Sequence, residues 1–500
     1  MKRFVLALDQ GTTSSRAILY DQDARAVSQA QVEFSQIYPR PGWVEHDPEV
    51  ILDSQFKAAR RCVDQAGVMP ADIAAIGITN QRETTLLWDR HTGRPVHNAI
   101  VWQCRRSAPQ CDRLSAAGYT EEIAARTGLV VDAYFSATKI QWMLEELPGV
   151  REQALSGRLA FGTVDTWLVW NLTLGAVHAT DSTNASRTML MDLDRRTWDP
   201  RLCELLEIPA SLLPEIRPSS GFFGKIADGV PGMERFAGIP ITGIAGDQHA
   251  ALFGQACLTP GSAKNTYGTG CFLLMNTGKQ RVRSRSGLLS TLAWEIPSGA
   301  CYALEGSVFN AGSAVQWLRD ELKMVESAPA CSALAATVEP ADDLYFVSAF
   351  TGLGAPHWDM YARGLLIGLT RGTDRARIAR AVLDGIAYQV ADLIDAMEQD
   401  AGMRLTDLRA DGGASASEPL MQFQADLLDC RVDRPADIET TALGAAFFAG
   451  LAVGFWDGLD TIASLRRTGK VFTPAMEADR RTRLRAGWHR ALERAKAWEE

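Results

Sequence analysis

The sequence has few cysteines and no arrangement of them that marks an extracellular or metal-binding chain. The nine cysteines lie between Cys62 and Cys430, their number is odd, and no CxxC pair occurs. A disulfide framework is therefore not expected, and a reducing, cytoplasmic compartment fits better. The seven histidines show no spacing typical of a zinc site.

An excess of basic residues is also missing. Lysine and arginine total 51 against 60 aspartates and glutamates, which gives a net charge of −9. A general nucleic-acid-binding protein needs a basic surface to neutralise phosphates, so no nucleic-acid partner is expected. Small anionic ligands remain possible, because a few local donors can hold a phosphate on an acidic protein.

Long hydrophobic runs are absent. The apolar stretch Phe4–Leu8 is too short for a signal-peptide core and has no cleavage site after it. Ala442–Trp456 is uncharged, but it is shorter than the ~20 residues that a bilayer span needs. Its glycines, Gly444, Gly450 and Gly454, favour a buried helix with close neighbours. No membrane insertion is expected.

Several common catalytic motifs do not occur. Each Gly-Lys pair lacks the following Ser or Thr of a P-loop, and there is no GxGxxG, GxSxG or HExxH. P-loop, Rossmann, protein-kinase, α/β-hydrolase and zincin sites are thereby disfavoured. The chain has 500 residues, 46% hydrophobic and 22% charged. Those values predict an ordered protein of about three domains, or two large ones.

The N-terminal segment alternates apolar runs with a polar turn. Phe4–Leu8 and Arg16–Tyr20 read as strands, and Asp9–Ser15 as the turn of a β-hairpin. Further strands are predicted over Ile73–Thr79 and Ile239–Ala245. Helices are predicted over residues 49–65, 136–147 and 247–253, and over the Arg-rich C-terminal stretch 480–500.

Two Gly/Thr turns have the chemistry of a phosphate loop. The turn after Asp9 contains Gly11 and several hydroxyls, so backbone N–H and side-chain donors could surround phosphate oxygens. Asp9 could hold Mg²⁺ through water. Gly268-Thr269-Gly270 has a similar texture about half the chain later, which suggests a duplicated architecture. An ordinary hairpin turn is an equally good interpretation of either motif alone.

Two further aspartates, Asp247 and Asp411, lie next to possible ligand sites. Asp247 begins a predicted helix, where Asp is most often an N-cap, but the carboxyl ends of strands are also where α/β folds place ligands. Asp411 precedes Gly412-Gly413, a turn that lets a flat ring or a phosphate approach the backbone. Together with the two Gly/Thr turns, these features indicate a nucleotide site shared between two domains.

Longer segments carry a resemblance that is far more specific than any single turn. The chain resembles the FGGY carbohydrate-kinase family, within the actin/hexokinase/Hsp70-like ATPase superfamily. The resemblance rests on residues 8–16, 41–48, 77–85, 101–106, 246–248 and 264–272, and on a signature over 134–146 that contains Lys139 and Trp142.

The resemblance implies an α/β fold of two ribonuclease-H-like (actin-like ATPase) domains, residues 1–254 and 255–500. Each domain would have a central mixed sheet flanked by helices, with the active site in the cleft between them. The implied activity is ATP-dependent phosphorylation of glycerol to sn-glycerol 3-phosphate with Mg²⁺, in a cytoplasmic homodimer or homotetramer.

The same resemblance implies roles for individual residues. Asp247 would be the general base, and Asp9 and Asp247 would hold Mg²⁺. Glycerol would bind to Arg82, Glu83, Tyr134, Asp247 and Gln248, with Trp102 and Phe272 as an apolar wall. Thr12, Thr13, Ser14 and Arg16 would bind the ATP phosphates, and Thr269, Gly312, Gln316, Gly413 and Ser417 would complete the nucleotide site.

Two departures from the family pattern concern possible ligand sites. Ser417 stands where many bacterial members have Asn, so a contact with adenosine is in doubt. In the loop 228–238, where many bacterial members bind fructose 1,6-bisphosphate, Gly238 takes the place of an Arg. We expect that inhibitor site to be weakened or missing, and saturable inhibition by the bisphosphate would contradict this.

Two other functions remain open from the residues. One is a different FGGY kinase acting on a pentulose, erythritol or dihydroxyacetone, although Arg82-Glu83 and Trp102 argue against it. The other is a non-catalytic actin-like or Hsp70-like ATPase module. Arg82-Glu83 could also be an ordinary surface ion pair, and the aromatic residues could be core.

Overall fold

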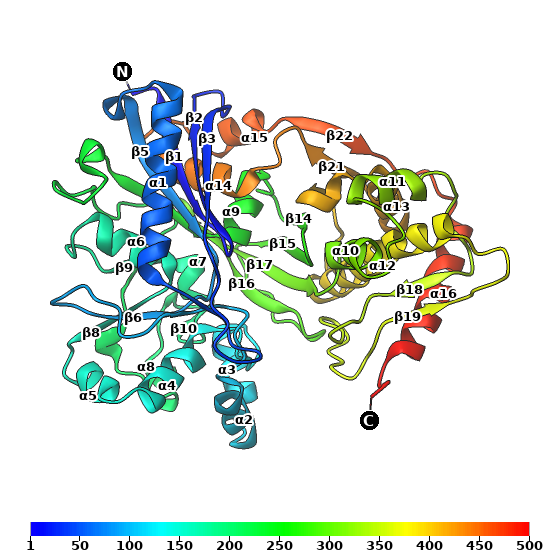
Figure 1. Cartoon of the computed structure of the whole chain (residues 1–500), viewed down its shortest axis with the longest axis horizontal. Coiled ribbons are helices and arrows are strands. Elements are labelled where there is room, and N and C mark those ends of the chain that lie inside the picture. The colour runs from blue at the N-terminus through cyan, green and yellow to red at the C-terminus, as the bar shows by residue number, and fades with distance from the viewer. Residues whose placement is uncertain (1, 500) are drawn as a thin grey trace.

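The computed structural model describes residues 2–499, which form two lobes, each built around a β-sheet (Figure 1). The first sheet has five strands in the order β13-β5-β1-β2-β3. Its strands are β1 (Phe4–Gln10), β2 (Ser14–Tyr20), β3 (Ala26–Glu33), β5 (Ile73–Asn80) and β13 (Ile241–Gly246).

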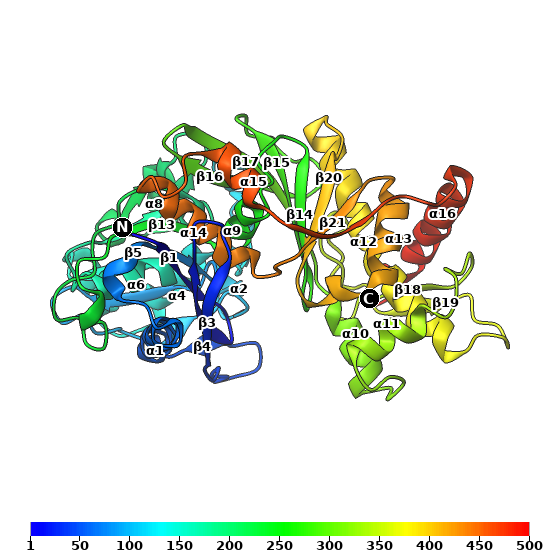
Figure 2. The ribbon, with the colours of Figure 1, turned by 90° about the horizontal axis from the view of Figure 1, so that it is seen from above.

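The second sheet has seven strands in the order β16-β17-β15-β14-β20-β21-β22. Figure 2 shows it side by side with the first lobe. Its strands are β14 (Ser262–Tyr267), β15 (Cys271–Gly278), β16 (Leu289–Ile296), β17 (Gly299–Val308), β20 (Asp407–Asp411), β21 (Val432–Pro435) and β22 (Thr468–Phe472).

The two sheets share one plan. In the first, β1 pairs antiparallel with β2 and parallel with β5. In the second, β14 pairs antiparallel with β15 and parallel with β20. Next to these three strands, β3 and β13 in the first sheet correspond to β17 and β21 in the second, which has β16 and β22 as additional edge strands. The predicted duplication and the mixed α/β fold class are therefore confirmed.

The predicted N-terminal hairpin is confirmed, with a shorter turn. Val5–Leu8 are fully buried, as expected for a central strand covered on both faces. The strands continue to Gln10 and restart at Ser14, because the Gly11 amide already donates to the Ser14 carbonyl at 2.9 Å. The predicted turn over Asp9–Ser15 was thus too long, and Asp9 lies within β1 directly opposite Arg16.

The predicted helices are also present. α1 (Pro48–Ala66) begins at Asp47, whose carboxylate accepts from the Glu49 amide, and ends at Gly67 in the left-handed region. The predictions near 136 and 247 correspond to α4 (Ser136–Glu146) and α9 (Asp247–Gly254). The C-terminal prediction corresponds to α16 (Ala478–Ala495), which ends before the predicted residue 500.

The shorter elements complete the two lobes. The other helices are α2 (Ala108–Ala116), α3 (Thr120–Thr127), α5 (Val150–Leu155), α6 (Val164–Leu172), α7 (Ser182–Ala185), α8 (Pro200–Leu205), α10 (Gly312–Asp320), α11 (Ala328–Ala335), α12 (Arg375–Ala401), α13 (Glu418–Leu428), α14 (Thr440–Ala452) and α15 (Leu459–Leu465). The other strands are β4 (Glu45–His46), β6 (Leu86–Asp89), β7 (Ala99–Ile100), β8 (Leu159–Gly162), β9 (Ala179–Asp181), β10 (Met191–Asp192), β11 (Thr197–Trp198), β12 (Glu215–Arg217), β18 (Tyr345–Val347) and β19 (Leu365–Ile367).

Helix α14 comes late in the chain but packs on the first sheet, against β5, β13 and α9 (Figure 1). A Cβ on Gly77 of β5 would lie 2.1 Å from the Ala445 carbonyl oxygen, and one on Gly444 would lie 1.8 Å from that of Ala250. The predicted buried helix with close glycine contacts is thereby confirmed. The division at residues 254 and 255 stays a prediction, and α14 returns to the first lobe after it.

The cysteines and the helix lengths bear on disulfide bonds and on membrane insertion. All nine cysteines are buried and free, as expected without a disulfide framework. Between residues 2 and 499, none of the helices has the length and hydropathy required to cross a membrane.

Candidate active site

Asp9, Arg82 and Asp247 meet because of the sheet topology. Strands β1, β5 and β13 are parallel neighbours, so their carboxyl ends lie at one edge of the first sheet. Asp9 is near the end of β1, Arg82 follows β5, and Asp247 follows β13 at the start of α9. Two carboxylates and a guanidinium therefore converge where α/β folds place ligands.

Arg82 is held by carboxylates from both lobes. Its Nη1 and Nη2 donate to Glu305 Oε2 and Oε1 at 2.7 and 2.9 Å, a bidentate pair. Its Nε lies 3.2 Å from Asp247 Oδ1. The Arg82 side chain is only 2% exposed, and Glu305 lies on β17 of the second sheet. Arg82 is thus a buried member of an interlobe network rather than a surface ion pair.

Glu83 is fixed from its other side. Its φ is +59°, in the left-handed region that non-glycine residues rarely adopt. Arg187 Nε donates to Glu83 Oε1 at 2.7 Å, and Arg187 Nη2 donates to Glu305 Oε1 at 3.1 Å. Arg82, Glu83, Arg187 and Glu305 therefore form a buried cluster of alternating charge, which we call the acceptor clamp.

The acceptor clamp contains two residues that the sequence analysis missed. Arg187 carried no motif that set it apart from the other arginines. Glu305 did carry a signal, because it directly follows the apolar run Cys301–Leu304 in one strand. A lone charge in such a strand normally needs a buried partner.

The charges of the acceptor clamp shift its pKa values. Burial by itself would raise the pKa of Glu305, but Arg187 and Arg82 outweigh it and hold that pKa well below its usual range. Burial raises the pKa of Glu83 despite the opposing effect of Arg82 and Arg187. Glu305 is therefore a permanent anion between two buried cations.

Asp247 is the partly open carboxylate of this group, with its side chain 32% exposed. Its Oδ1 accepts from the Gln248 amide at 2.7 Å. Burial raises its pKa above the ordinary value, although Arg82 and Lys264 oppose that shift. A carboxylate with a raised pKa accepts a proton more readily, so Asp247 is suited to act as a base.

Gln248 and Lys264 lie beside the acceptor clamp and link α9 to the second sheet. Lys264 is fully buried on β14, and its Nζ donates to Gln248 Oε1 and, at 3.0 Å, to Thr266 Oγ1. Burial lowers the pKa of Lys264. Because the Gln248 oxygen is engaged, its amide NH₂ group is the end left for another acceptor.

Three aromatic rings stand beside the acceptor clamp. Trp102 makes edge contacts with Tyr134 and Phe272, with ring centroids 5.7 and 6.4 Å apart. The Tyr134 hydroxyl accepts from Arg82 Nη2 at 3.3 Å. Trp102 Nε1 donates to Thr12 Oγ1 at 3.0 Å, so this apolar wall touches the turn between β1 and β2.

The turn Gly11–Thr13 presents donors at the mouth of the site. Thr13 is exposed and Thr12 is half-buried, whereas Ser14 is buried at the start of β2. Gln81, which was not among the predicted site residues, holds this turn through hydrogen bonds. Its Nε2 donates to the Gly11 carbonyl and to Gln10 Oε1, both at 3.0 Å.

Asp9 and Arg16 lie opposite each other behind that turn. Burial raises the pKa of Asp9 to about 7, with Glu439 and Asp247 adding to the shift and Arg16 opposing it. A carboxyl among other carboxylates favours a bound cation. No cluster of three or more His, Cys, Asp or Glu suited to a metal occurs in residues 2–499. A hard cation such as Mg²⁺ would therefore need oxygen ligands from a substrate or water besides Asp9 and Asp247.

The turn Gly268–Gly270 of the second sheet corresponds to Gly11–Thr13. Thr269 is exposed at its tip. The Gly312 amide, at the start of α10, donates to the Gly268 carbonyl at 2.9 Å, and a Cβ on Gly312 would lie 2.6 Å from that oxygen. Only a glycine fits this approach of helix to turn. Gln316 is exposed one turn further along α10.

The Gly412-Gly413 turn follows β20 on the same edge of the second sheet. A Cβ on Gly412 would lie 2.7 Å from the Tyr267 carbonyl oxygen, whereas Gly413 is exposed, with open space where its Cβ would be. Ser417 is buried, and its hydroxyl lies 3.0 Å from that of Ser332 on α11. The structure thus brings Thr269, Gly312 and Gly413 together, while Ser417 has a protein partner.

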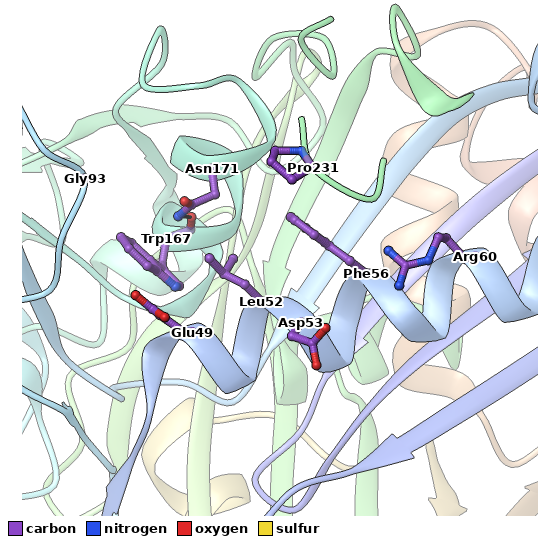
Figure 3. A pocket seen from close by; sticks show the side chains of 9 residues that line it. All are labelled: Glu49, Leu52, Asp53, Phe56, Arg60, Gly93, Trp167, Asn171 and Pro231. Atoms are coloured by element: carbon purple, nitrogen blue, oxygen red, sulfur yellow. Dashed lines mark hydrogen bonds between the residues drawn. The ribbon is translucent and has the colours of Figure 1, made fainter. Parts of the chain in front are cut away.

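A separate hollow of about 290 Å³ lies away from these residues, between α1, α6 and the loop with Pro231 (Figure 3). None of the predicted site residues lines it. Its loop is tied to α1, because Arg60 donates to the Gly232 carbonyl at 2.8 Å and Arg235 pairs with Asp64 at 2.6 Å. The expected loss of a fructose 1,6-bisphosphate site in this loop stays a prediction.

Comparison with protein families decides the relationship. Residues 4–254 match the N-terminal domain of the FGGY family of carbohydrate kinases, and residues 263–453 match its C-terminal domain. The chain belongs to the FGGY family of carbohydrate kinases. A glycerol kinase of Halorhodospira halophila is 60% identical over 498 residues, which cover 100% of this chain and 97% of that protein. Glycerol kinase 2 of Thermotoga maritima is 57% identical and covered in full.

Solved structures of FGGY kinases have the same fold. Plasmodium falciparum glycerol kinase with ADP aligns with a TM-score of 0.94 and 38% identity, covering 98% of each chain. A xylulose kinase from Lactobacillus acidophilus aligns with a TM-score of 0.88 over 98% of this chain and 97% of its own, at 22% identity. The second likeness shows the fold alone.

Proposed function

We propose that this protein transfers the γ-phosphoryl group of ATP to glycerol, giving sn-glycerol 3-phosphate. The acceptor clamp carries the proposal. Arg82 and Glu83 offer buried donors and an acceptor side by side, next to the apolar wall of Trp102 and Phe272. The glycerol kinases of Halorhodospira halophila and Thermotoga maritima, similar over the full chain, support the same substrate.

The shape and polarity of the site suit a small polyol. Glycerol has hydroxyls on a thin carbon edge, so one side needs hydrogen bonds and the other needs apolar cover. Arg82, Glu83 and Gln248 would meet the hydroxyls, with Tyr134 and Asp247. Trp102 and Phe272 would cover the CH₂ groups. An analogue lacking a hydroxyl would leave buried polar groups unpaired, and the site would reject it.

Asp247 is the residue we propose as general base. It is oriented by the Gln248 amide and by Arg82 Nε, and its raised pKa favours proton uptake. It would accept the proton of the attacking terminal hydroxyl as the γ-phosphoryl group moves in line from ATP to that oxygen and ADP leaves. The proton then rests on an Asp247 oxygen until solvent removes it.

The nucleotide would lie between the two turns. Thr12, Thr13, Ser14 and Arg16 would bind its phosphates from the first lobe. Thr269, Gly312, Gln316 and Gly413 would hold it from the second lobe, with Ser417 as a further candidate. Asp9 and Asp247 would hold Mg²⁺, which neutralises negative charge on the phosphates. We call this set the nucleotide cradle.

Closure of the lobes would be needed to exclude water from the transferring phosphoryl group. The acceptor clamp already joins both sheets, so the movement would mainly concern the nucleotide cradle. Assembly as a homodimer or homotetramer stays an expectation, which light scattering on the purified protein tests directly.

The proposal is tested with an acceptor panel. ADP release is coupled to an indicator reaction and measured with glycerol, erythritol, dihydroxyacetone, xylulose and ribulose. We expect the highest kcat/KM with glycerol. Higher kcat/KM with a pentulose would replace glycerol by another FGGY substrate, and ADP release independent of any acceptor would indicate a non-catalytic ATPase module.

A further inference from the structure

Glu439 is a carboxylate beside the nucleotide cradle that none of the roles above uses. It occupies the N-cap position of α14, yet its side chain makes no capping hydrogen bond. Its Oε2 instead accepts from Arg16 Nη1. Its own backbone N–H is held by Asp437 Oδ1 at 3.0 Å. The Glu439 side chain therefore contacts Arg16 and does not accept from a backbone N–H of the first turn of α14, as an N-cap side chain usually does.

The backbone that carries Glu439 is firmly placed. Helix α14 sits on the first sheet through the close approach of Gly77 to Ala445. The next residue, Thr440, is buried, and its hydroxyl donates to Asp411 Oδ2 at 2.5 Å. Asp411 directly precedes Gly412-Gly413 of the second lobe. Two consecutive residues thus contact both lobes, Glu439 through Arg16 of β2 and Thr440 through Asp411 of β20.

The contact leaves part of Arg16 open. Within residues 2–499 only Nη1 of its guanidinium has a side-chain or backbone acceptor, so Nε and Nη2 have no protein partner. A guanidinium is a planar fork that binds a phosphate through two neighbouring N–H groups. Glu439 holds one edge of that fork and leaves the Nε–Nη2 edge for an anion.

Stability does not explain the pair. The side chains of Arg16 and Glu439 are 36% and 30% exposed. Ion pairs with that exposure contribute only about 0–1 kcal/mol to folding. The arrangement is better explained by orientation of Arg16, because a long side chain next to solvent otherwise samples many rotamers.

We propose that Glu439 is a positioning residue for nucleotide binding. It fixes the Arg16 guanidinium so that the Nε–Nη2 edge faces the phosphates. The inference rests on the proposed function to the extent that a nucleotide binds at Arg16, but it does not depend on which acceptor is phosphorylated.

A double-mutant cycle on the full-length protein tests the proposal. The variants are Glu439→Ala, Arg16→Ala and the combination, with MgADP affinity measured by calorimetry and KM measured for ATP and glycerol. We expect Glu439→Ala to weaken MgADP binding about tenfold, or about 1.4 kcal/mol. KM for glycerol should change less than about twofold. In the Arg16→Ala background, removal of Glu439 should have no further effect.

Two further variants separate positioning from a structural role. Glu439→Gln keeps an oxygen that can accept from Arg16, so it should weaken MgADP binding by less than Glu439→Ala does. Glu295→Gln removes the carboxylate of a comparable half-exposed pair, Arg196–Glu295, and should leave MgADP affinity and both KM values unchanged. Thermal unfolding of each variant checks that it is folded.

Three results would overturn the proposal: unchanged or tighter MgADP binding in Glu439→Ala, additive effects in the cycle, or an equal loss of glycerol affinity. If Glu439→Ala does not fold, the cycle is run with Glu439→Gln and the same criteria apply. Wild-type protein that binds MgADP without phosphorylating glycerol would contradict the proposed function only, so the two failures are distinguishable.

Discussion

Arg82 and Arg16 both end near the carboxyl edge of the first sheet, but their surroundings differ. Arg82 is 2% exposed and contacts Glu305, Asp247 and the Tyr134 hydroxyl, whereas Arg16 is 36% exposed and pairs with Glu439. The acceptor clamp is buried, and its charged side chains pair with one another. The nucleotide cradle is open, and its parts come from exposed turns of both lobes.

The difference concerns what each region must do. A buried charge cluster holds a fixed geometry, and removal of one member leaves an unpaired buried charge. It therefore suits recognition of a small acceptor whose hydroxyls must be met in one arrangement. Open turns with half-exposed charges can move as lobes close, which suits a nucleotide that enters and leaves in each cycle.

The largest effect is expected for Asp247→Asn, because it removes the proposed base without changing the size of the side chain. Asp247 is the first residue of α9, after the N-cap Gly246, and an Asn oxygen can still accept from the Gln248 amide, so α9 should keep its start. We expect kcat to fall about 10²–10⁴-fold. MgADP affinity should stay within about threefold, since Asp9 and both turns remain. Steady-state kinetics and calorimetry provide the two values, and retained phosphoryl transfer would remove Asp247 as the base.

Next in size is the effect of Glu305→Ala on the acceptor clamp. It leaves Arg82 and Arg187 buried without their shared carboxylate, which costs about 3–5 kcal/mol of folding free energy. In protein that still folds, Arg82 is no longer held in one orientation towards glycerol. KM for glycerol should therefore rise more than about tenfold. MgADP affinity should change little.

Glu305→Gln is the conservative partner of that variant, because it keeps one acceptor oxygen for the arginines and replaces the other by an NH₂ donor. Its thermal unfolding midpoint and glycerol KM should lie between those of wild type and Glu305→Ala. An equal loss of MgADP and glycerol affinity in either variant would show that the two regions are not separate, and would break the comparison.

The pH dependence should separate the two regions as well. The pKa of Asp9 is raised to about 7, so its carboxyl is neutral below that pH and cannot hold a cation. Mg²⁺-dependent ADP binding should therefore weaken as pH falls from 7, by up to roughly tenfold per pH unit. Glycerol binding should change less over the same range, because Glu305, which holds Arg82 and Arg187, stays ionised.

Calorimetric titrations between pH 5.5 and pH 8.5, each with and without Mg²⁺, measure this effect. In the Asp9→Asn variant, the Mg²⁺-dependent change of ADP affinity with pH should be absent. A glycerol affinity that follows the same pH profile, or a variant that keeps that change, would assign the titration to another group.

The smallest effect is expected at the contact between the regions. Trp102→Phe keeps most of the apolar wall but removes the hydrogen bond from Trp102 Nε1 to Thr12 Oγ1. One such bond is worth about 0.5–1.5 kcal/mol, so KM for ATP and for glycerol should each rise about two- to tenfold. Tyr134→Phe keeps the ring and removes only the hydroxyl that accepts from Arg82, so it should raise KM for glycerol alone. A Trp102→Phe effect confined to one substrate would show that the contact does not couple them.

Local patterns in the sequence predicted much of the frame. The apolar run Phe4–Leu8 is a central strand, and the polar turns after β1 and β14 occupy equivalent places in two sheets of one plan. Asp9 and Asp247 could be selected because they follow apolar strands, and carboxyl ends of parallel strands meet at one edge. These inferences need only neighbours along the chain, where residue type and spacing decide the outcome.

The partners of those residues could not be predicted in the same way. Arg82 meets Glu305 across 223 positions and Arg16 meets Glu439 across 423, and no periodicity or local motif links such pairs. Helix α14 is apolar on all sides, so its pattern indicates burial but not which sheet it covers. The residue types at the site were thus set by sequence, whereas their pairing, burial and pKa values depend on long-range packing, because charges interact through space with whatever the folded chain places beside them.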